Sequence, residues 1–186
     1  MIEIVYGRKF LLNMMPAHSI CAEIGVDRGV FSEEILETVN PRKLHLIDPW
    51  DYYSARYDIV CRKFANRVES GQVQIHNGKS QLLYDLFPDE YFDWIYVDGS
   101  HSYKSVRNDL DLYYPKVKMY GFITGDDYRL VEKRRGLRDA VAEIAEKYLM
   151  RLILIQNNQY ILWKKGPEPA PSGPLRLPKQ TELLFE

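Results

Sequence analysis

The sequence predicts an α/β fold: a mostly parallel sheet of about seven strands, with helices on both faces and an antiparallel hairpin at its C-terminal end. Two observations lead to this prediction. Short apolar runs alternate with longer stretches of helical period through most of the chain, which is typical of parallel strands joined by helices. The last two apolar runs are separated by only four residues, which indicates a hairpin.

The expected strands are short apolar runs, most of them ended by residues that favour a turn. In order, they are residues 19–24 before Gly25, 44–47 before Asp48-Pro49, 73–76 before Asn77-Gly78, 92–97 before Asp98-Gly99, 121–124 before Gly125, and then 151–155 and 160–163. The two final runs form the hairpin.

The expected helices lie between these strands and have apolar residues at helical spacing. In order, they are residues 30–39 before Asn40-Pro41, 55–68 before Ser70-Gly71, 80–87 before Pro88, 103–113 before Pro115, and 131–148. Residues 1–17 precede the first strand, and we expect them to form a short strand or helix over one edge of the sheet.

The chain length and the distribution of proline indicate one domain with a tail. A chain of 186 residues is long enough for a single apolar core. After Gly166 the composition changes, and five of the ten prolines lie within residues 167–178. We therefore expect an N-terminal edge segment (1–18), a main domain (19–165) and a Pro-rich flexible tail (166–186).

The composition argues against several classes of partner. The formal net charge is −1, and only residues 133–135 form a basic run, so we expect no nucleic-acid partner. No apolar run approaches the roughly 18 residues of a membrane span, so we expect no membrane partner. Cys21 and Cys61 imply no disulfide framework, and the N-terminus lacks a signal-peptide pattern. We expect a cytoplasmic protein that acts on a small molecule and could form a homo-oligomer.

The turn after the first expected strand carries acidic side chains. A dinucleotide site instead has glycines at this turn, so that the backbone N–H groups can contact the pyrophosphate. It runs from Glu23 through Gly25 to Gly29, and Asp27 stands where the dinucleotide pattern has its middle glycine. A pyrophosphate at this helix start would be repelled by the two acids. S-adenosylmethionine (SAM) instead carries a sulfonium and an ammonium group, and nearby carboxylates favour a cation. We therefore predict that SAM is the cofactor and that Glu23, Gly25 and Asp27 bind it.

Residues after the second and third expected strands complete the predicted cofactor site. Asp48 ends the second strand, where an acid is suited to hold the ribose hydroxyls. Gly78 and Ser80 lie in the polar turn after the third strand, where the adenine could bind. Aromatic residues after Asp48 could form a wall for the adenine or the acceptor. These residues are Trp50, Tyr52 and Tyr53.

Three aspartates follow the fourth and fifth expected strands. Asp98 ends the fourth strand and Asp126 and Asp127 end the fifth, so the carboxylates should meet beside the cofactor. A divalent cation would relieve their repulsion, and oxygen ligands favour a hard ion such as Mg²⁺. The alternative is that Asp98 forms a turn with Gly99 and that Asp127 caps the next helix. We predict a Mg²⁺ site at the three aspartates, with Asp98 also beside the cofactor.

Four segments resemble one group of enzymes. They are A-E-I-G-V at 22–26, L-I-D-P-W at 46–50, V-D-G-S-H-S-Y at 97–103 and G-D-D-Y at 125–128. Together they resemble the macrocin O-methyltransferase-like group, over roughly residues 20 to 163. The resemblance implies a Rossmann-like class I methyltransferase sheet, the same three aspartates as Mg²⁺ ligands, and methylation of sugar hydroxyls on antibiotics.

The predicted reaction is methylation of a hydroxyl group on a sugar or vicinal diol. A metal would bind two neighbouring acceptor oxygens and lower the pKa of the hydroxyl. Asp98 or His101 would then take the proton. Three alternatives stay open: a metal-free methyltransferase with Asp98 as the base, a non-catalytic SAM-binding module, and transfer of an aminopropyl group from a SAM-like cofactor.

Overall fold

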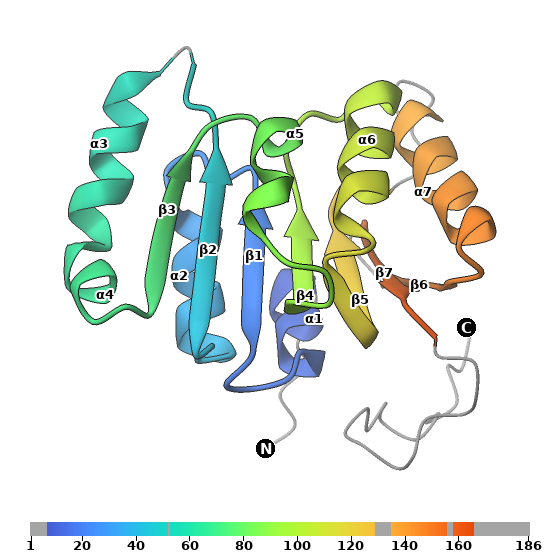
Figure 1. Cartoon of the computed structure of the whole chain (residues 1–186), viewed down its shortest axis with the longest axis horizontal. Coiled ribbons are helices and arrows are strands. Elements are labelled where there is room, and N and C mark those ends of the chain that lie inside the picture. Colours follow the sequence, from blue (N-terminus) through green and yellow to red (C-terminus); the bar gives the residue numbers. More distant parts are fainter. Residues whose placement is uncertain (1–6, 52, 129–134, 156–157, 166–186) are drawn as a thin grey trace, which may run out of the picture.

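The computed structural model of the chain contains one seven-stranded sheet with the strand order β3-β2-β1-β4-β5-β7-β6 (Figure 1). The structure describes residues 7–51, 53–128, 135–155 and 158–165. Within them the strands are β1 (Ile20–Ile24), β2 (Lys43–Asp48), β3 (Val73–Asn77), β4 (Phe92–Val97), β5 (Val117–Gly125), β6 (Arg151–Ile155) and β7 (Gln159–Trp163). β1 to β5 pair in parallel, and β7 pairs antiparallel with both β5 and β6. The predicted fold class is confirmed.

The parallel register brings the turns that carry the predicted site to one edge of the sheet, the upper edge in Figure 1. Ile24 of β1 pairs with Ile47 of β2 and with Val97 of β4. Val97 in turn pairs with Gly125 of β5. The strand order reverses between β1 and β4, and open α/β sheets bind ligands at such a point.

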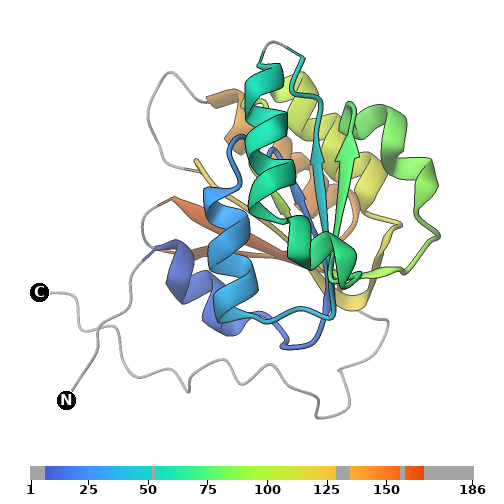
Figure 2. The same cartoon turned by 90° about the vertical axis from the view of Figure 1, so that its left-hand side faces the viewer.

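Helices cover both faces of the sheet, as the view along its plane shows (Figure 2). The helices of the described residues are α1 (Arg8–Met14), α2 (Val30–Thr38), α3 (Ser54–Lys63), α4 (Ala65–Glu69), α5 (Ser80–Leu83), α6 (Tyr103–Tyr113), α7 (Arg135–Lys147) and the 3-10 helix η1 (Tyr84–Leu86). α1, α2 and α3 contribute to one apolar core, and α5, α6 and α7 pack against the core on the opposite face.

Both cores hold the helices firmly against the strands that carry the site. Leu11 of α1 and Ile35 of α2 are fully buried on one face. Leu110 of α6 and Ile144 of α7 are fully buried on the other. Burial of an aliphatic side chain of this size contributes about 1.5–3 kcal/mol. The turns at the upper edge therefore start from a rigid frame.

The N-terminal segment forms a helix on a face of the sheet, which differs from the edge position that we expected. Leu11 and Leu12 of α1 pack in the same core as Phe122 of β5 and Ile161 of β7. The physical reason is the antiparallel hairpin. β7 extends the sheet beyond β5, and this additional apolar surface requires a cover that α1 provides.

Three element boundaries also differ from the sequence prediction. The helix expected at 55–68 is divided into α3 and α4, because the helical geometry is interrupted at Phe64, whose ring is buried. The helix expected at 80–87 is the single turn α5 followed by η1. β5 begins four residues earlier than expected, at Val117, and its pairing with β4 is irregular near Phe92.

Several predicted features lie outside the described residues. They are the start of the helix expected at 131–148, most of the basic run at 133–135, Tyr52, part of the hairpin turn and the tail at 166–186. In the part of the chain that the structure describes, no helix is both long and apolar enough to cross a membrane.

Candidate active site

A cavity of about 980 Å³ opens at the carboxyl ends of β1, β2 and β4. This volume is at the upper end of the range typical for small-molecule sites. Six of the residues predicted to bind the cofactor line it: Glu23, Gly25, Asp27, Asp48, Ser80 and Asp98. Most of the predicted cofactor residues therefore meet in one cavity.

The Gly25 turn closely approaches the turn after β4. Gly25 has a φ of 93°, and a Cβ at this position would collide with the backbone of Asp98. Its amide donates to the carbonyl of Ile47 over 2.9 Å, and the Asp98 amide donates to the carbonyl of Ile24 over 2.8 Å. Only glycine meets both requirements, a positive φ and the close approach. The turn thus leaves space for a ligand and ties three strand ends together.

Glu23 is a buried acid in the wall of the cavity, with a side chain that is 1% exposed. Burial raises the pKa of its carboxyl to about 8, although the Ser32 hydroxyl donates to it. A carboxyl with this pKa is largely protonated at pH 7. The charge pattern of the sequence suggested a fixed negative charge here, and burial is the reason for the difference.

The other acid of this turn, Asp27, lies at the surface and forms an ion pair with Arg56 of α3. The positive charge of Arg56 thus offsets the negative charge of Asp27 in this turn. Asp27 has a φ of 52°, in the left-handed region that aspartate tolerates better than most residues. Asp27 thus shapes the cavity wall through its backbone conformation as well as through its charge.

Asp48 organises the backbone of the turn after β1. One carboxylate oxygen accepts from the amides of Val26 and Asp27 over 2.8 and 3.1 Å, and the other accepts from the amide of Trp50 over 2.8 Å. Asp48 still lines the cavity. A carboxylate oxygen can accept more than one hydrogen bond, so these contacts leave capacity for ribose hydroxyls.

Trp50 and Gly78, both predicted to contact the cofactor, do not line the main cavity. Trp50 is buried, and its indole N–H donates to the carbonyl of Asp27 over 2.8 Å. It faces a smaller adjoining hollow of about 250 Å³ together with Tyr53, which lines both hollows. Gly78 packs against Leu83 of α5. Trp50 and Gly78 thus lie outside the lining of the main cavity, and their contact with the cofactor stays a prediction.

Asp109 of α6 is a cavity residue that the sequence analysis missed. It is 3% exposed, and Oδ1 accepts from the Ser80 hydroxyl over 2.6 Å and from the Gln81 amide over 2.9 Å. Burial raises the pKa of its carboxyl. The sequence pattern could have identified Asp109, because it lies with Val106 and Leu110 on the buried face of an amphipathic helix. An acid on such a face needs polar partners.

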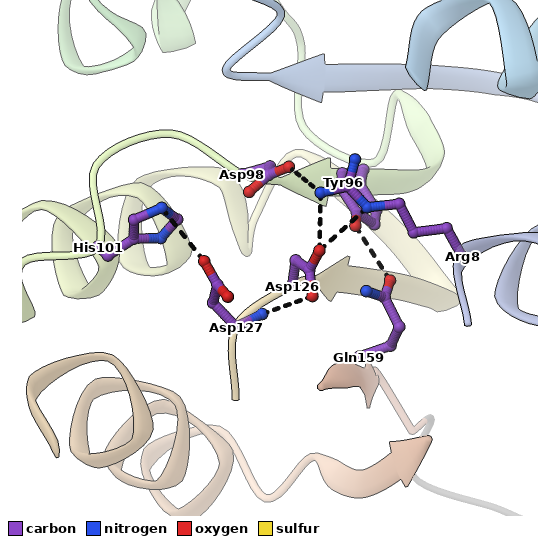
Figure 3. Close-up of polar contacts among 7 residues, drawn as sticks. All are labelled: Arg8, Tyr96, Asp98, His101, Asp126, Asp127 and Gln159. Carbon is purple, nitrogen blue, oxygen red and sulfur yellow. Dashed lines mark hydrogen bonds and ion pairs between the residues drawn. The ribbon is translucent and has the colours of Figure 1, made fainter. Parts of the chain in front are cut away.

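The carboxylates after β4 and β5 do converge, and an arginine lies between two of them (Figure 3). Arg8 Nη2 is 2.8 Å from Asp98 Oδ2 and 2.7 Å from Asp126 Oδ2. Arg8 Nε also donates to Asp126 Oδ2 over 3.0 Å. Arg8 was missed, because nothing in the sequence links an arginine to an acid 118 residues away. Arg8 thus relieves part of the repulsion between the carboxylates, which was the reason for predicting a metal ion.

Asp127 turns away from Arg8 and toward His101, on the opposite side of the cluster in Figure 3. His101 Nε2 is 3.3 Å from Asp127 Oδ2. One ligand atom each of Asp98, His101 and Asp127 lies within 4.8 Å of the others. The third aspartate of the predicted metal site, Asp126, instead pairs with Arg8, and its role as a ligand stays a prediction.

The pKa of Asp98 lies near neutral pH. Burial raises it to about 6, the carboxylate of Asp126 adds to the effect, and Arg8 opposes it. A carboxyl with such a pKa can exchange a proton at physiological pH, as an acid or base in catalysis must. Asp98 is the residue that the cavity and the carboxylate cluster share.

Two buried tyrosines support this cluster from β4 and β7. The Tyr96 hydroxyl donates to Gln159 Oε1 over 3.0 Å, and the Tyr96 ring lies 5.9 Å from the Arg8 guanidinium carbon (Figure 3). The Tyr160 hydroxyl has no hydrogen-bond partner among the described residues, and it would meet any side chain added at Gly125. Gly125 is therefore restricted by packing beneath the Asp126 turn.

Comparison with known proteins identifies similar folds. No curated protein matches the sequence. Among solved structures, the O-methyltransferase NovP is 21% identical with a TM-score of 0.63, and the match covers 85% of this chain and 76% of NovP. A provisionally assigned rRNA methylase from Clostridium thermocellum is 12% identical with a TM-score of 0.67, covering 89% and 99%. Fibrillarin from Aeropyrum pernix, solved with bound SAM, is 7% identical with a TM-score of 0.59, covering 80% and 66%.

At these identities the structural likeness shows the fold, and the family assignment comes from the sequence. A model described as a methyltransferase domain matches residues 22–128, more than half of the chain. The match extends from the strand before the Gly25 turn to the residue after Asp127, and so includes both parts of the site. The narrower macrocin O-methyltransferase-like assignment stays a prediction. The chain belongs to this methyltransferase family, and it is an enzyme of the SAM-dependent class.

Proposed function

We propose that the protein transfers the methyl group of SAM to a hydroxyl oxygen of a small molecule. The observation that carries this proposal is the position of Asp98. It lines the cofactor-sized cavity, and it also lies against His101 and Asp127 outside that cavity. A donor bound in the cavity and an acceptor bound beside His101 would meet at a carboxyl group that can exchange a proton.

The residues of the cavity suit a cofactor that carries positive charge. Glu23, Asp48 and Asp98 line it, and Glu23 can ionise when a cation lies beside it. Gly25 leaves the backbone of the turn bare, so a ligand can lie directly against it. SAM, when bound, supplies an activated methyl group. Glu23, Gly25 and Asp48 would hold it, and Asp98 would lie at the reacting end.

The acceptor side has two groups that can take the proton of a hydroxyl. Asp98 has a pKa of about 6, so it is mostly ionised at pH 7 and can act as a general base. His101 is exposed and paired with Asp127, which can orient its ring and stabilise a positive charge on it. An O-methyltransferase needs such a base, and we infer that the acceptor is a sugar or another vicinal diol.

A divalent cation fits the donor atoms of Asp98, Asp127 and His101, which converge within 4.8 Å. Such a cation, when bound, would lower the pKa of the acceptor hydroxyl. Two carboxylates and an imidazole suit Mn²⁺ or a similar ion as well as Mg²⁺. The second candidate is a metal-free enzyme, and Arg8 favours it because its guanidinium already compensates Asp98 and Asp126.

Transfer of labelled methyl from SAM to a panel of sugars and diols tests the proposal. We expect turnover with at least one acceptor, and we expect Asp98→Asn to lower kcat by about 100-fold or more, because a base contributes 10²–10⁴-fold. Asp139→Asn, at an exposed site on α7, serves as the matched control and should keep full activity. Labelling of RNA but of no small molecule would contradict the proposal.

Chelation separates the two candidates. If Asp98, His101 and Asp127 hold a metal, exhaustive EDTA treatment should abolish turnover, and added Mg²⁺ or Mn²⁺ should restore it. Full turnover after EDTA, unchanged by added metal, would establish the metal-free enzyme in which Arg8 provides the positive charge.

A further inference from the structure

Arg8 lies where the N-terminal helix meets the cofactor cavity. It is the first residue of α1, it lines the cavity, and its guanidinium lies 4.9 Å from the ring centre of Phe31, another cavity residue. Asp98 and Asp126 hold the guanidinium in place through Nη2 and Nε. The side chain is thus positioned by three contacts and remains 38% exposed.

The contacts of Arg8 leave part of its hydrogen-bonding capacity unused. A guanidinium has five N–H donors, and the bonds to Asp98 and Asp126 involve only those on Nε and Nη2. Among the described residues, none accepts a hydrogen bond from Nη1. The N–H groups of Nη1 are therefore left to donate a charge-assisted hydrogen bond to a carboxylate oxygen of a ligand.

The charges around Arg8 match an amino acid zwitterion. Glu23 and Arg8 line the same cavity, and the charge of Arg8 opposes the rise in the pKa of Glu23. The cavity therefore offers a carboxyl group for an ammonium and a guanidinium for a carboxylate. The SAM molecule ends in an α-amino acid, which carries these two groups on one carbon.

The other cations of the cavity wall are less suited to this role. Lys79 follows β3 and forms an ion pair with Asp51 after β2, over 3.5 Å. Arg28 lies exposed in the turn before α2. Only Arg8 is held by Asp98, the residue that we place at the reacting end.

We propose that Arg8 binds the α-carboxylate of the amino acid group of SAM, while Glu23 faces the α-ammonium. This inference rests on the proposed binding of SAM in the cavity. It gives the N-terminal helix a role in binding, because α1 carries the residue that recognises one end of the cofactor. It also makes Arg8 a specificity determinant, since a donor without the carboxylate would leave Nη1 without a partner.

This role bears on the aminopropyl alternative. Aminopropyl transfer uses decarboxylated SAM, in which the α-carboxylate is replaced by hydrogen. A site with Arg8 at the amino acid end should discriminate against decarboxylated SAM. Its ammonium group would lie near the guanidinium without the α-carboxylate that compensates the two positive charges in SAM. Arg8 therefore favours methyl transfer over aminopropyl transfer.

Calorimetry with S-adenosylhomocysteine (SAH) and its decarboxylated analogue tests the proposal. The wild type should bind SAH at least about 10-fold more tightly than the analogue, since a charge-assisted pair contributes that much or more. Arg8→Gln should weaken SAH binding by about 10-fold or more, change binding of the analogue little, and so remove the preference. Arg8→Lys should restore part of it.

Two controls separate a binding role from a structural one. Arg28→Gln removes another arginine of the cavity wall and should keep the preference for SAH. The double variant R8Q/D126N removes the ion pair without leaving Asp126 unpaired, and it should behave as Arg8→Gln does. Equal loss of SAH and analogue in both Arg8 variants, or loss of the preference in Arg28→Gln only, would overturn the proposal. If the wild type binds neither ligand, the proposed SAM site itself is wrong.

Discussion

Glu23 shows how the charge of a single residue can follow the ligand. With a pKa of about 8, its carboxyl is mostly protonated at pH 7 in the free protein. A cation beside it would favour the ionised form and lower that pKa. Binding of SAM should then release a proton from Glu23.

This proton release can be measured by calorimetry at pH 7 in buffers of different ionisation enthalpy. We expect close to one proton to leave per SAM bound, and the affinity to rise with pH up to about 8. Glu23→Gln, which keeps the shape and cannot ionise, should bind SAM more weakly and release no proton. The same proton release from Glu23→Gln would assign the effect to another group.

At the residue scale, the sequence predicted acids better than their partners. Glu23, Asp48 and Asp98 follow strands, so a correct assignment of strands also places these acids at one edge of the sheet. Arg8 lies in a helix on a face of the sheet, and only the packing of α1 against β4, β5 and β7 brings it to Asp126. No local pattern contains that information.

At the scale of elements, β2 and β3 share a histidine pair, in which His45 is buried and His76 is half-buried. His45 Nδ1 and His76 Nε2 are 2.9 Å apart, and His45 Nε2 is 3.1 Å from the Tyr91 hydroxyl. Burial lowers the pKa of His45 to about 3, with a contribution from His76, and burial also lowers the pKa of His76. The pair is therefore neutral in the folded protein near neutral pH.

The histidine pair should make stability depend on pH. His45 titrates near 6.5 when unfolded and near 3 when folded, so the unfolded state binds more protons between these values. The free energy of unfolding should then fall with decreasing pH below about 6.5, by up to about 1.4 kcal/mol per pH unit. Urea unfolding of the wild type and of His45→Asn at several pH values measures this slope. An equal slope in both proteins would rule out His45 as the cause.

The elements that the sequence predicted well are those with strong local patterns. β1, β2 and β4 are buried apolar runs bounded by turn residues, and their positions agree with the structure. The split between α3 and α4 and the early start of β5 depend on tertiary packing, at Phe64 and opposite Phe92 respectively. Periodicity alone cannot show either.

At the scale of the whole molecule, the cavity is built from the ends of many elements. Residues of α1, β1, α2, β2, α5 and α6 line it, together with the turns between them. A ligand in the cavity therefore contacts segments that would all separate on unfolding. Ligand binding to the folded state alone stabilises it.

SAH should raise the melting temperature of the protein. At 100 times its Kd the gain is about 2.7 kcal/mol, which corresponds to about 5–10 °C for a chain of this size. Gly25→Ala, whose Cβ would collide with the Asp98 backbone, should show little or no rise. Differential scanning fluorimetry measures both, and an equal rise in Gly25→Ala would place SAH elsewhere.

The pairing of Arg8 with Asp126 also sets a delay during synthesis. The ribosome adds 118 residues after Arg8 to reach Asp126. At 5–20 residues per second this takes about 6 to 24 s. During that interval the nascent chain has β1 and the Gly25 turn but lacks β5 and β7. The ion pair that fixes Arg8 in the cavity wall can therefore form only after the chain has been extended past β5.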